Sequence, residues 1–261
     1  NQKVLYLTSS LLFPIANYIT LPVFIVSASL EVFGYYFLLL AVVNMASLII
    51  GFGLVNTINA YYFYWSKTNS KKYNFANISL IAVIHFTVAA IVMSLVYYAF
   101  TNILDYELQA LNLLLSIIFF AAMLYLKDML TIFFRIDDKI FALILLNITL
   151  VILDTSIKIT YLKMFEFKIE YYLLIAATSI FFTYGLVHIV YIIKNSFIKG
   201  LKSKKMLVYY RYNFGMYKSN VLGRSASLSD RPLIAIFLSE YDLGLYALAH
   251  RFSSTLSSFR A

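Results

Sequence analysis

Cysteine is absent from this chain of 261 residues, and charged side chains are scarce, at 13% of the total. Without cysteine, the chain has no thiol nucleophile, disulfide scaffold or cysteine-ligated metal site. Water-soluble domains are about a quarter charged and roughly 45–50% apolar, whereas 62% of these residues are hydrophobic. The composition therefore excludes a soluble enzyme and indicates a polytopic integral membrane protein.

Acidic residues are fewer than basic ones, 12 against 21, which gives a formal net charge of +9. In a membrane protein this excess indicates cytoplasmic loops that face anionic lipid, so we expect membrane lipids as partners and no nucleic acid. The three histidines, His85, His188 and His250, are scattered along the sequence. We therefore expect neither a metal site nor a cofactor.

Six segments are long and apolar enough to cross a membrane, for which about 20 residues are needed. A seventh candidate, Asn213–Leu238, is more polar, and an eighth begins near Asp242 and continues to the last residue. Because the chain lacks an initial Met and stops within a span, we expect it to be part of a longer protein. The six complete candidates are Tyr6–Ala28, Phe33–Tyr61, Asn77–Phe100, Leu108–Phe134, Ile140–Tyr161 and Tyr171–Ile193.

Basic residues alternate between the loops in a way that predicts the orientation. If the N-terminus is cytoplasmic, the outer loops carry only Lys163 and Lys168. The positive-inside rule then predicts a multi-pass protein of the cytoplasmic (inner) cell membrane with its N-terminus inside. The inner segments carry Lys3, Lys67, Lys71, Lys72, Arg135, Lys139, Lys194, Lys199, Lys202, Lys204, Lys205 and Arg211.

Three parts are expected in the domain organisation. Residues 1–193 would form a first bundle of six transmembrane helices, and residues 213–261 the first one to two helices of a second bundle. Between them, the basic segment 194–212 is predicted to be a cytoplasmic linker or an amphipathic segment on the lipid surface.

An internal repeat connects the two predicted bundles. Several residues near the first and second spans recur 210 positions later, and this offset corresponds to six spans, so both copies would cross the membrane in the same direction. Transporters commonly use such parallel repeats, with the substrate between two lobes. The matching pairs are Pro22 with Pro232, Ser29 with Ser239, Phe33 with Leu243, Gly34 with Gly244 and Tyr36 with Tyr246.

Three segments carry a resemblance to a known family. Leu7–Gly34 resembles the first helix of bacterial polysaccharide flippases, and Gly51-Phe52-Gly53-Leu54, leading into Asn59-Ala60-Tyr61-Tyr62, resembles the end of their second helix. The run from Ser229-Asp230-Arg231-Pro232 to Gly244-Leu245-Tyr246-Ala247 resembles their seventh-to-eighth helix junction, an aspartate-arginine pair, an apolar run and a glycine-x-tyrosine motif. Pro232 departs from this pattern, in which a hydrophobic residue follows the arginine.

These flippases are the O-antigen and capsule unit transporters of the multidrug/oligosaccharidyl-lipid/polysaccharide exporter superfamily. The resemblance implies an all-α, MATE-like fold with twelve or more spans in two six-helix bundles that face a central cavity. It also implies a role in polysaccharide and lipopolysaccharide biosynthesis, with a lipid-linked oligosaccharide as substrate and contact with the polysaccharide polymerase machinery.

Polar residues of the seventh span are the first candidates for a substrate site, because charges in a bilayer usually face a bundle interior. Their spacing of three and four places them along one helical face, with Lys218 and Asp230 beside it. Arginine matches phosphate oxygens well, so this face could line a cavity for a pyrophosphate or an acidic sugar. The alternative is an inter-helix salt bridge. The face comprises Asn213, Tyr217, Asn220, Arg224, Ser227 and Arg231.

Further polar residues occur in the earlier spans. Asp154 and Lys158 have the spacing and order of a favourable helical ion pair, with either a neutralising role or one in gating or substrate binding. Lys127 and Asp128 are adjacent, so they point in different directions; we expect Lys127 to snorkel toward water and Asp128 to face the cavity. Asn17 could bind sugar hydroxyls or contact a neighbouring helix.

We therefore predict a transporter and not an enzyme. The expected function is translocation of an undecaprenyl-pyrophosphate-linked polysaccharide repeat unit across the cytoplasmic membrane by alternating access, driven by substrate consumption or by a coupling ion, H+ or Na+. The alternatives are an ion-coupled multidrug exporter of the same superfamily and a membrane polysaccharide polymerase or glycosyltransferase.

Overall fold

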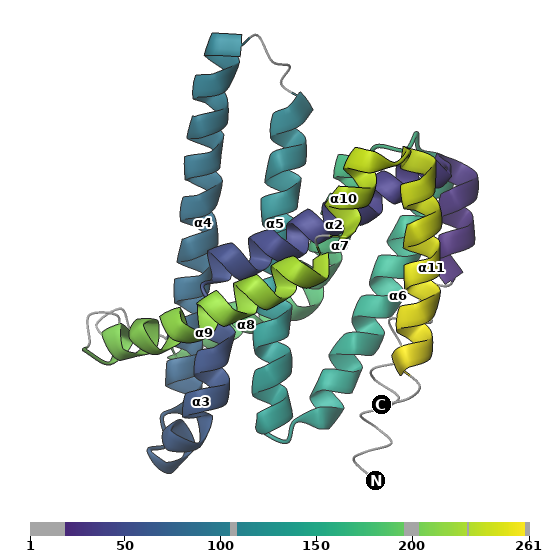
Figure 1. The fold of residues 1–261 in the computed structure, drawn as a ribbon. Helices are drawn as coiled ribbons and strands as arrows, with labels where there is room; N and C mark the ends of the chain where they lie inside the picture. The colour runs from purple at the N-terminus through teal and green to yellow at the C-terminus, as the bar shows by residue number, and fades with distance from the viewer. Residues whose placement is uncertain (1–18, 105–108, 196–203, 229, 259–261) are drawn as a thin grey trace.

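The computed structural model is helical and describes residues 19–104, 109–195, 204–228 and 230–258 (Figure 1). A short apolar helix, Ile19–Ala28, precedes the others. The helices that follow it are α2 (Leu30–Gly51), α3 (Leu54–Lys67), α4 (Lys71–Leu104), α5 (Gln109–Ile136), α6 (Ile140–Met164), α7 (Ile169–Ile180), the π-helical turn η1 (Phe181–Gly185), α8 (Leu186–Asn195), α9 (Lys204–Leu228), α10 (Asp230–Phe237) and α11 (Glu240–Ser258).

Among the residues that the structure describes, five helical segments are long and apolar enough to span a membrane, which fits a polytopic helical membrane protein. Four of them coincide with predicted spans, and the fifth, α2, contains most of another. Of the first predicted span, the part before residue 19 lies outside the described residues. The five segments are Leu30–Gly51, Lys71–Tyr98, Leu111–Ile136, Ile140–Met164 and Ile169–Asn195.

The predicted span Phe33–Tyr61 is wrong as a single helix. α2 ends at Gly51, and both Phe52 (φ 50°) and Gly53 (φ 66°) have left-handed backbone conformations before α3 begins. Left-handed residues end an α-helix, and glycine adopts this conformation without the steric penalty of a side chain. Hydropathy averaged over a window does not detect such a break.

The predicted span Asn213–Leu238 is also divided. α9 begins at Lys204, within the segment expected to be a linker, and α10 begins only after Leu228, at Asp230. Pro232 lies in the first turn of α10, where a proline is tolerated because its missing N–H would have no intrahelical partner. The Asp230 carboxylate accepts a hydrogen bond from the Arg231 backbone nitrogen at 2.9 Å, and an acidic residue in the first turn suits the dipole of the helix.

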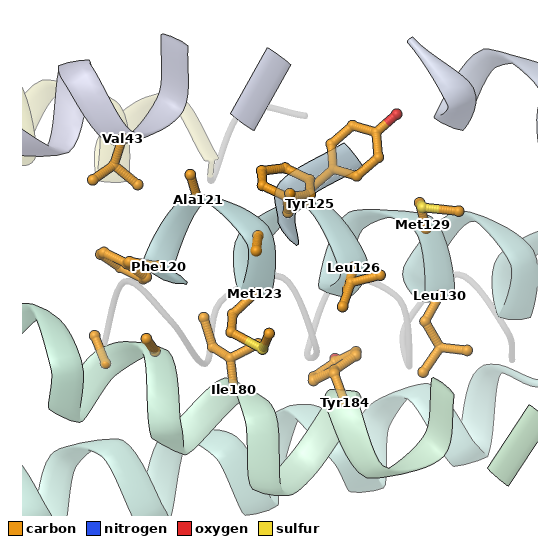
Figure 2. Packing of buried hydrophobic residues seen from close by; sticks show 14 of the residues in the cluster. Val43, Phe120, Ala121, Met123, Tyr125, Leu126, Met129, Leu130, Ile180 and Tyr184 are labelled. Carbon is orange, nitrogen blue, oxygen red and sulfur yellow. The ribbon is translucent and has the colours of Figure 1, made fainter. Parts of the chain in front are cut away.

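α5 lies at the centre of the bundle and packs against α2, α3, α4, α6 and α7. Figure 2 shows Leu126 and Leu130 directed from α5 toward Tyr184, with Val43 of α2 beyond Ala121 on another side. These side chains are buried. In contrast, α4 exposes a row of apolar side chains that suits contact with lipid: Val88, Ile91, Val92 and Leu95.

An ion-pair group joins the ends of α3, α4 and α5. The Asp137 carboxylate lies 2.5 Å from the Lys71 amine and 2.7 Å from the Lys139 amine, and it also accepts a hydrogen bond from Tyr62. Desolvation alone would raise the pKa of Asp137, but the hydrogen bonds from Lys139, Lys71 and Tyr62 outweigh it and lower the pKa to about 2. This group lies at the end of the bundle predicted to be cytoplasmic.

Candidate functional site: a polar cavity at a helix break

The break between α2 and α3 is held by a tyrosine from α5. The Tyr125 hydroxyl donates a hydrogen bond to the Gly51 carbonyl oxygen (2.8 Å) and accepts one from the Val55 backbone nitrogen (3.0 Å). A helix end leaves carbonyl and N–H groups without intrahelical partners, and this one hydroxyl bonds to one group from each helix. Gly51 is required here, because a Cβ atom at this position would overlap the Tyr125 ring.

A polar cavity of about 270 Å³ adjoins this break, between α2, α3, α5 and α9, and we call it the break cavity. Its charged lining consists of two arginines and one aspartate, and hydroxyl and amide side chains surround them. The Asn56 amide nitrogen is buried and has no hydrogen-bond partner among the described residues. The polar lining residues are Ser47, Asn56, Tyr125, Asp128, Thr131, Arg135, Asn220 and Arg224.

α9 is held against the break by aromatic and hydrogen-bond contacts. Phe52 stacks on Tyr217 with ring centroids 4.9 Å apart. The Asn213 amide nitrogen donates a hydrogen bond to the Thr57 hydroxyl (2.7 Å), and that hydroxyl donates to the Asn213 oxygen (2.9 Å). The Trp65 ring nitrogen donates to the hydroxyl of Tyr209 (2.9 Å). These contacts place the next two turns of α9 beside the break cavity.

The polar face predicted for the seventh span is therefore divided among different roles. Asn220 and Arg224 line the break cavity together with Asp128. Asn213 and Tyr217 instead attach α9 to its neighbours. Lys218 is exposed, with its amine 4.5 Å from the Phe214 ring centre. The side chain of Ser227, and Asn17 as a whole, lie outside the described residues.

Arg231 does not line the break cavity. The start of a new helix at Asp230 turns it toward α2, where its guanidinium carbon lies 4.0 Å from the centre of the Phe37 ring. Arg231 is buried, and its Nε atom has no hydrogen-bond partner in the described part of the chain. Asp230 accepts a hydrogen bond from Tyr246 of α11. The two guanidiniums of Arg224 and Arg231 are thus in different environments, and not on one face as predicted.

A second polar cavity of about 200 Å³ lies between α2, α5, α6, α7 and α11. Asp154 and Lys158 line it and form the predicted ion pair, with the amine 2.7 Å from the carboxylate. Lys127 and Arg251 complete its charged lining. We call it the lysine cavity. Lys127 and Asp128 point in different directions, as expected, but Lys127 faces this cavity.

Several residues of the candidate sites were not anticipated from the sequence as site residues, among them Asn56, Thr131, Arg135 and Arg251. Arg135 was interpreted as a cytoplasmic anchor, although its position two turns after Asp128 puts both on one face of a helix. Arg251 lies in the eighth predicted span, and no pattern connects it with Asp154. Sequence spacing can reveal neighbours on one helix, whereas contacts between helices depend on how those helices cross.

The repeat-related residues of α2 and α11 meet at the crossing of these helices. A Cβ atom on Gly34 would lie 2.6 Å from the Gly244 nitrogen, so only glycine permits this approach. Ser29 and Ser239, one residue before each helix, accept hydrogen bonds from the backbone nitrogens of Val32 (3.5 Å) and Asp242 (3.1 Å). Phe33 and Leu243 are both buried. At these three pairs, equivalent positions of the two segments thus have equivalent structural roles.

Comparison of the chain with protein-family models, with curated proteins and with solved structures gives no match.

Proposed function

We propose that this protein is a flippase of the polysaccharide-transporter type, which moves a lipid-linked oligosaccharide across the cytoplasmic membrane by alternating access. The observation that supports the proposal most is the break cavity, where Arg135 and Arg224 face the same polar space within a bundle of membrane-length helices. The substrate of the proposed reaction is an undecaprenyl-pyrophosphate-linked repeat unit.

The chemistry of the lining suits the head of such a lipid. A guanidinium can donate two parallel hydrogen bonds to phosphate oxygens, and its interaction is stronger away from bulk water. Asn220, Asn56 and Thr131 offer donors and acceptors of the kind that sugar hydroxyls require. A volume of about 270 Å³ suits the pyrophosphate and the first sugar, and the lipid tail would stay in the bilayer.

The alternating-access part of the proposal rests on the repeat. α2 and α11 begin with equivalent serine caps and touch through equivalent glycines, as expected for elements of two parallel lobes. In the proposed cycle the lobes rock about this crossing, and the break cavity opens to each side in turn. Binding can bias such a switch only if the substrate prefers one of the two states.

The test is translocation of a labelled lipid-linked glycan by the full-length protein in proteoliposomes. Arg224→Gln is expected to lower the rate at least tenfold, because hydrogen bonds to charged groups contribute about 1.5–3 kcal/mol and 1.4 kcal/mol is a factor of ten. The matched control is Arg211→Gln, an arginine on the same helix that does not line the break cavity; both arginines are exposed. Equal rates for the two variants would contradict the site, and no translocation by the unmodified protein would contradict the function.

The two alternative functions receive less support from the cavity. An exporter of cationic drugs needs a site rich in carboxylates, but arginines outnumber the one aspartate in the break cavity. A polymerase or glycosyltransferase needs a reactive acidic cluster, whereas Asp137 is occupied by two lysines and a tyrosine.

A further inference from the structure

The lysine cavity has a lining in which positive charge predominates. Three basic side chains, Lys127, Lys158 and Arg251, face it together with a single carboxylate, that of Asp154. They come from α5, α6 and α11, so the cavity depends on the packing of separate helices. With all four side chains ionised, the lining carries a net charge of +2.

Of these basic side chains, Lys158 has the contacts that the structure shows in most detail. It is buried, its amine lies 2.7 Å from one oxygen of Asp154, and the amine is 5.1 Å from the centre of the Tyr172 ring. The other oxygen of Asp154 is also buried and has no hydrogen-bond partner among the described residues. Because the one carboxylate among the described lining residues is already paired with a lysine, the lining is unsuited to a second cation.

The lysine cavity is separate from the break cavity. The two share no lining residue, and they lie on different sides of α5, since Lys127 faces one cavity and its neighbour Asp128 the other. The volume is about 200 Å³, which has space for roughly six or seven water-sized groups at about 30 Å³ each. It can hold a small partly hydrated ion, but not an oligosaccharide.

We propose that the lysine cavity is a binding site for a small monovalent anion, either a halide or the carboxylate of a small acid. A mainly positive lining in a low-dielectric bundle attracts an anion and repels Na+. The bound anion accepts hydrogen bonds from Lys158 and from one or both of the other basic groups. The ring of Tyr172 borders the lysine amine, and Tyr36 lines the cavity. This site goes beyond the proposed function and does not depend on it.

The proposal assigns Asp154 the opposite effect from the one it would have in a cation site. In an anion site its carboxylate reduces the net positive charge, so Asp154→Asn should strengthen anion binding. In a Na+ or H+ site the same carboxylate would be the essential ligand, and Asp154→Asn would abolish binding. The sign of this change therefore separates the two kinds of site.

The experiment is equilibrium binding of radiolabelled chloride to the purified full chain in lipid nanodiscs. The unmodified protein should bind chloride saturably. Lys158→Met should weaken the affinity at least tenfold, and Asp154→Asn should increase it. The matched control is Lys163→Met, an exposed lysine on the same helix, which should leave the affinity unchanged. Size-exclusion chromatography establishes that each variant is folded, and Asp154→Asn remains decisive if Lys158→Met does not fold.

Competition identifies the ligand. Displacement of the label by bromide but not by acetate would indicate a halide site, and displacement by acetate as well would indicate a carboxylate site. Sodium gluconate and choline chloride separate the effect of Na+ from that of chloride in a thermal-unfolding assay. The proposal is overturned if no saturable binding occurs, if Lys158→Met binds like Lys163→Met, or if stabilisation follows Na+. None of these readouts involves a glycan or Arg224, so the outcome is independent of flippase activity.

Discussion

The break cavity and the lysine cavity both border α5, but their polar groups are positioned in different ways. In the break cavity, α2 stops at Gly51, and backbone groups released by the break bond to Tyr125. In the lysine cavity a pair four residues apart on the continuous helix α6 supplies the best-defined contact. The break cavity thus depends on a local interruption of a helix, and the ion pair of the lysine cavity on one continuous helix.

This difference has a consequence for mobility. Non-helical backbone at membrane depth is tolerated where it borders protein or a water-filled cavity, and a break lets two helix segments move with some independence. A pair on one rigid helix moves as a unit. We therefore expect a large glycolipid headgroup to be handled at the break and a small ion at the intact helix.

The largest loss of folding free energy at either cavity is expected for Lys158→Met. It leaves the Asp154 carboxylate in the membrane without its lysine, which costs about 3 kcal/mol of folding free energy. The double variant Asp154→Asn with Lys158→Met removes both charges and should be more stable than Lys158→Met. Thermal unfolding of the purified variants measures this, and an equally stable single and double variant would show that the pair is not coupled.

A smaller loss of folding free energy is expected for Gly51→Ala, at the break between α2 and α3. Gly51→Ala places a Cβ atom in the space of the Tyr125 ring, so both hydrogen bonds across the break weaken, and overpacking of this kind costs about 1–3 kcal/mol. Gly223→Ala is the matched control, because a Cβ atom there meets no other atom within 4 Å. If both variants unfold at the same temperature, Tyr125 does not hold the break in the way described.

The sequence predicted the membrane helices well because each depends mainly on a local run of apolar residues. It also predicted the Asp154–Lys158 pair, since both residues lie on one helix. It failed where the chain leaves the helical path, at Phe52–Gly53 and before Asp230. An extrapolated helical face is valid only as far as the helix is continuous, and this is why Arg224 and Arg231 were expected to act together.

The candidate sites were predicted in part for the same reason. Asn220 and Arg224 share a face of α9, so their joint exposure to one cavity could be inferred from spacing. Their meeting with Arg135 and Asp128 of α5 depends on how α9 packs against α2 and α3, which no local pattern encodes. The internal repeat is an exception, because equivalent positions of two segments, Gly34 and Gly244, indicated a relation between distant parts of the chain.

The smallest change in folding free energy is expected when the Asp137 carboxylate, which lies outside both cavities, becomes protonated. Its pKa is lowered from the ordinary value of 3.8 to about 2. The ionised carboxylate therefore stabilises the fold fully above about pH 4, and this contribution, roughly 1–2 kcal/mol, is lost as the pH falls toward 2. Asp137→Asn should remove the corresponding step from a plot of unfolding temperature against pH. An unchanged step would assign the acid sensitivity to another carboxylate.

Binding of undecaprenyl pyrophosphate to the full-length protein, compared with binding of the uncharged alcohol undecaprenol, shows whether the break cavity recognises an anionic lipid headgroup. We predict that the pyrophosphate binds at least tenfold more tightly, and that this preference disappears in the double variant Arg135→Gln with Arg224→Gln but persists in Arg211→Gln. If the two lipids bind equally to the unmodified protein, or if the double variant keeps the preference, the break cavity does not recognise an anionic lipid headgroup.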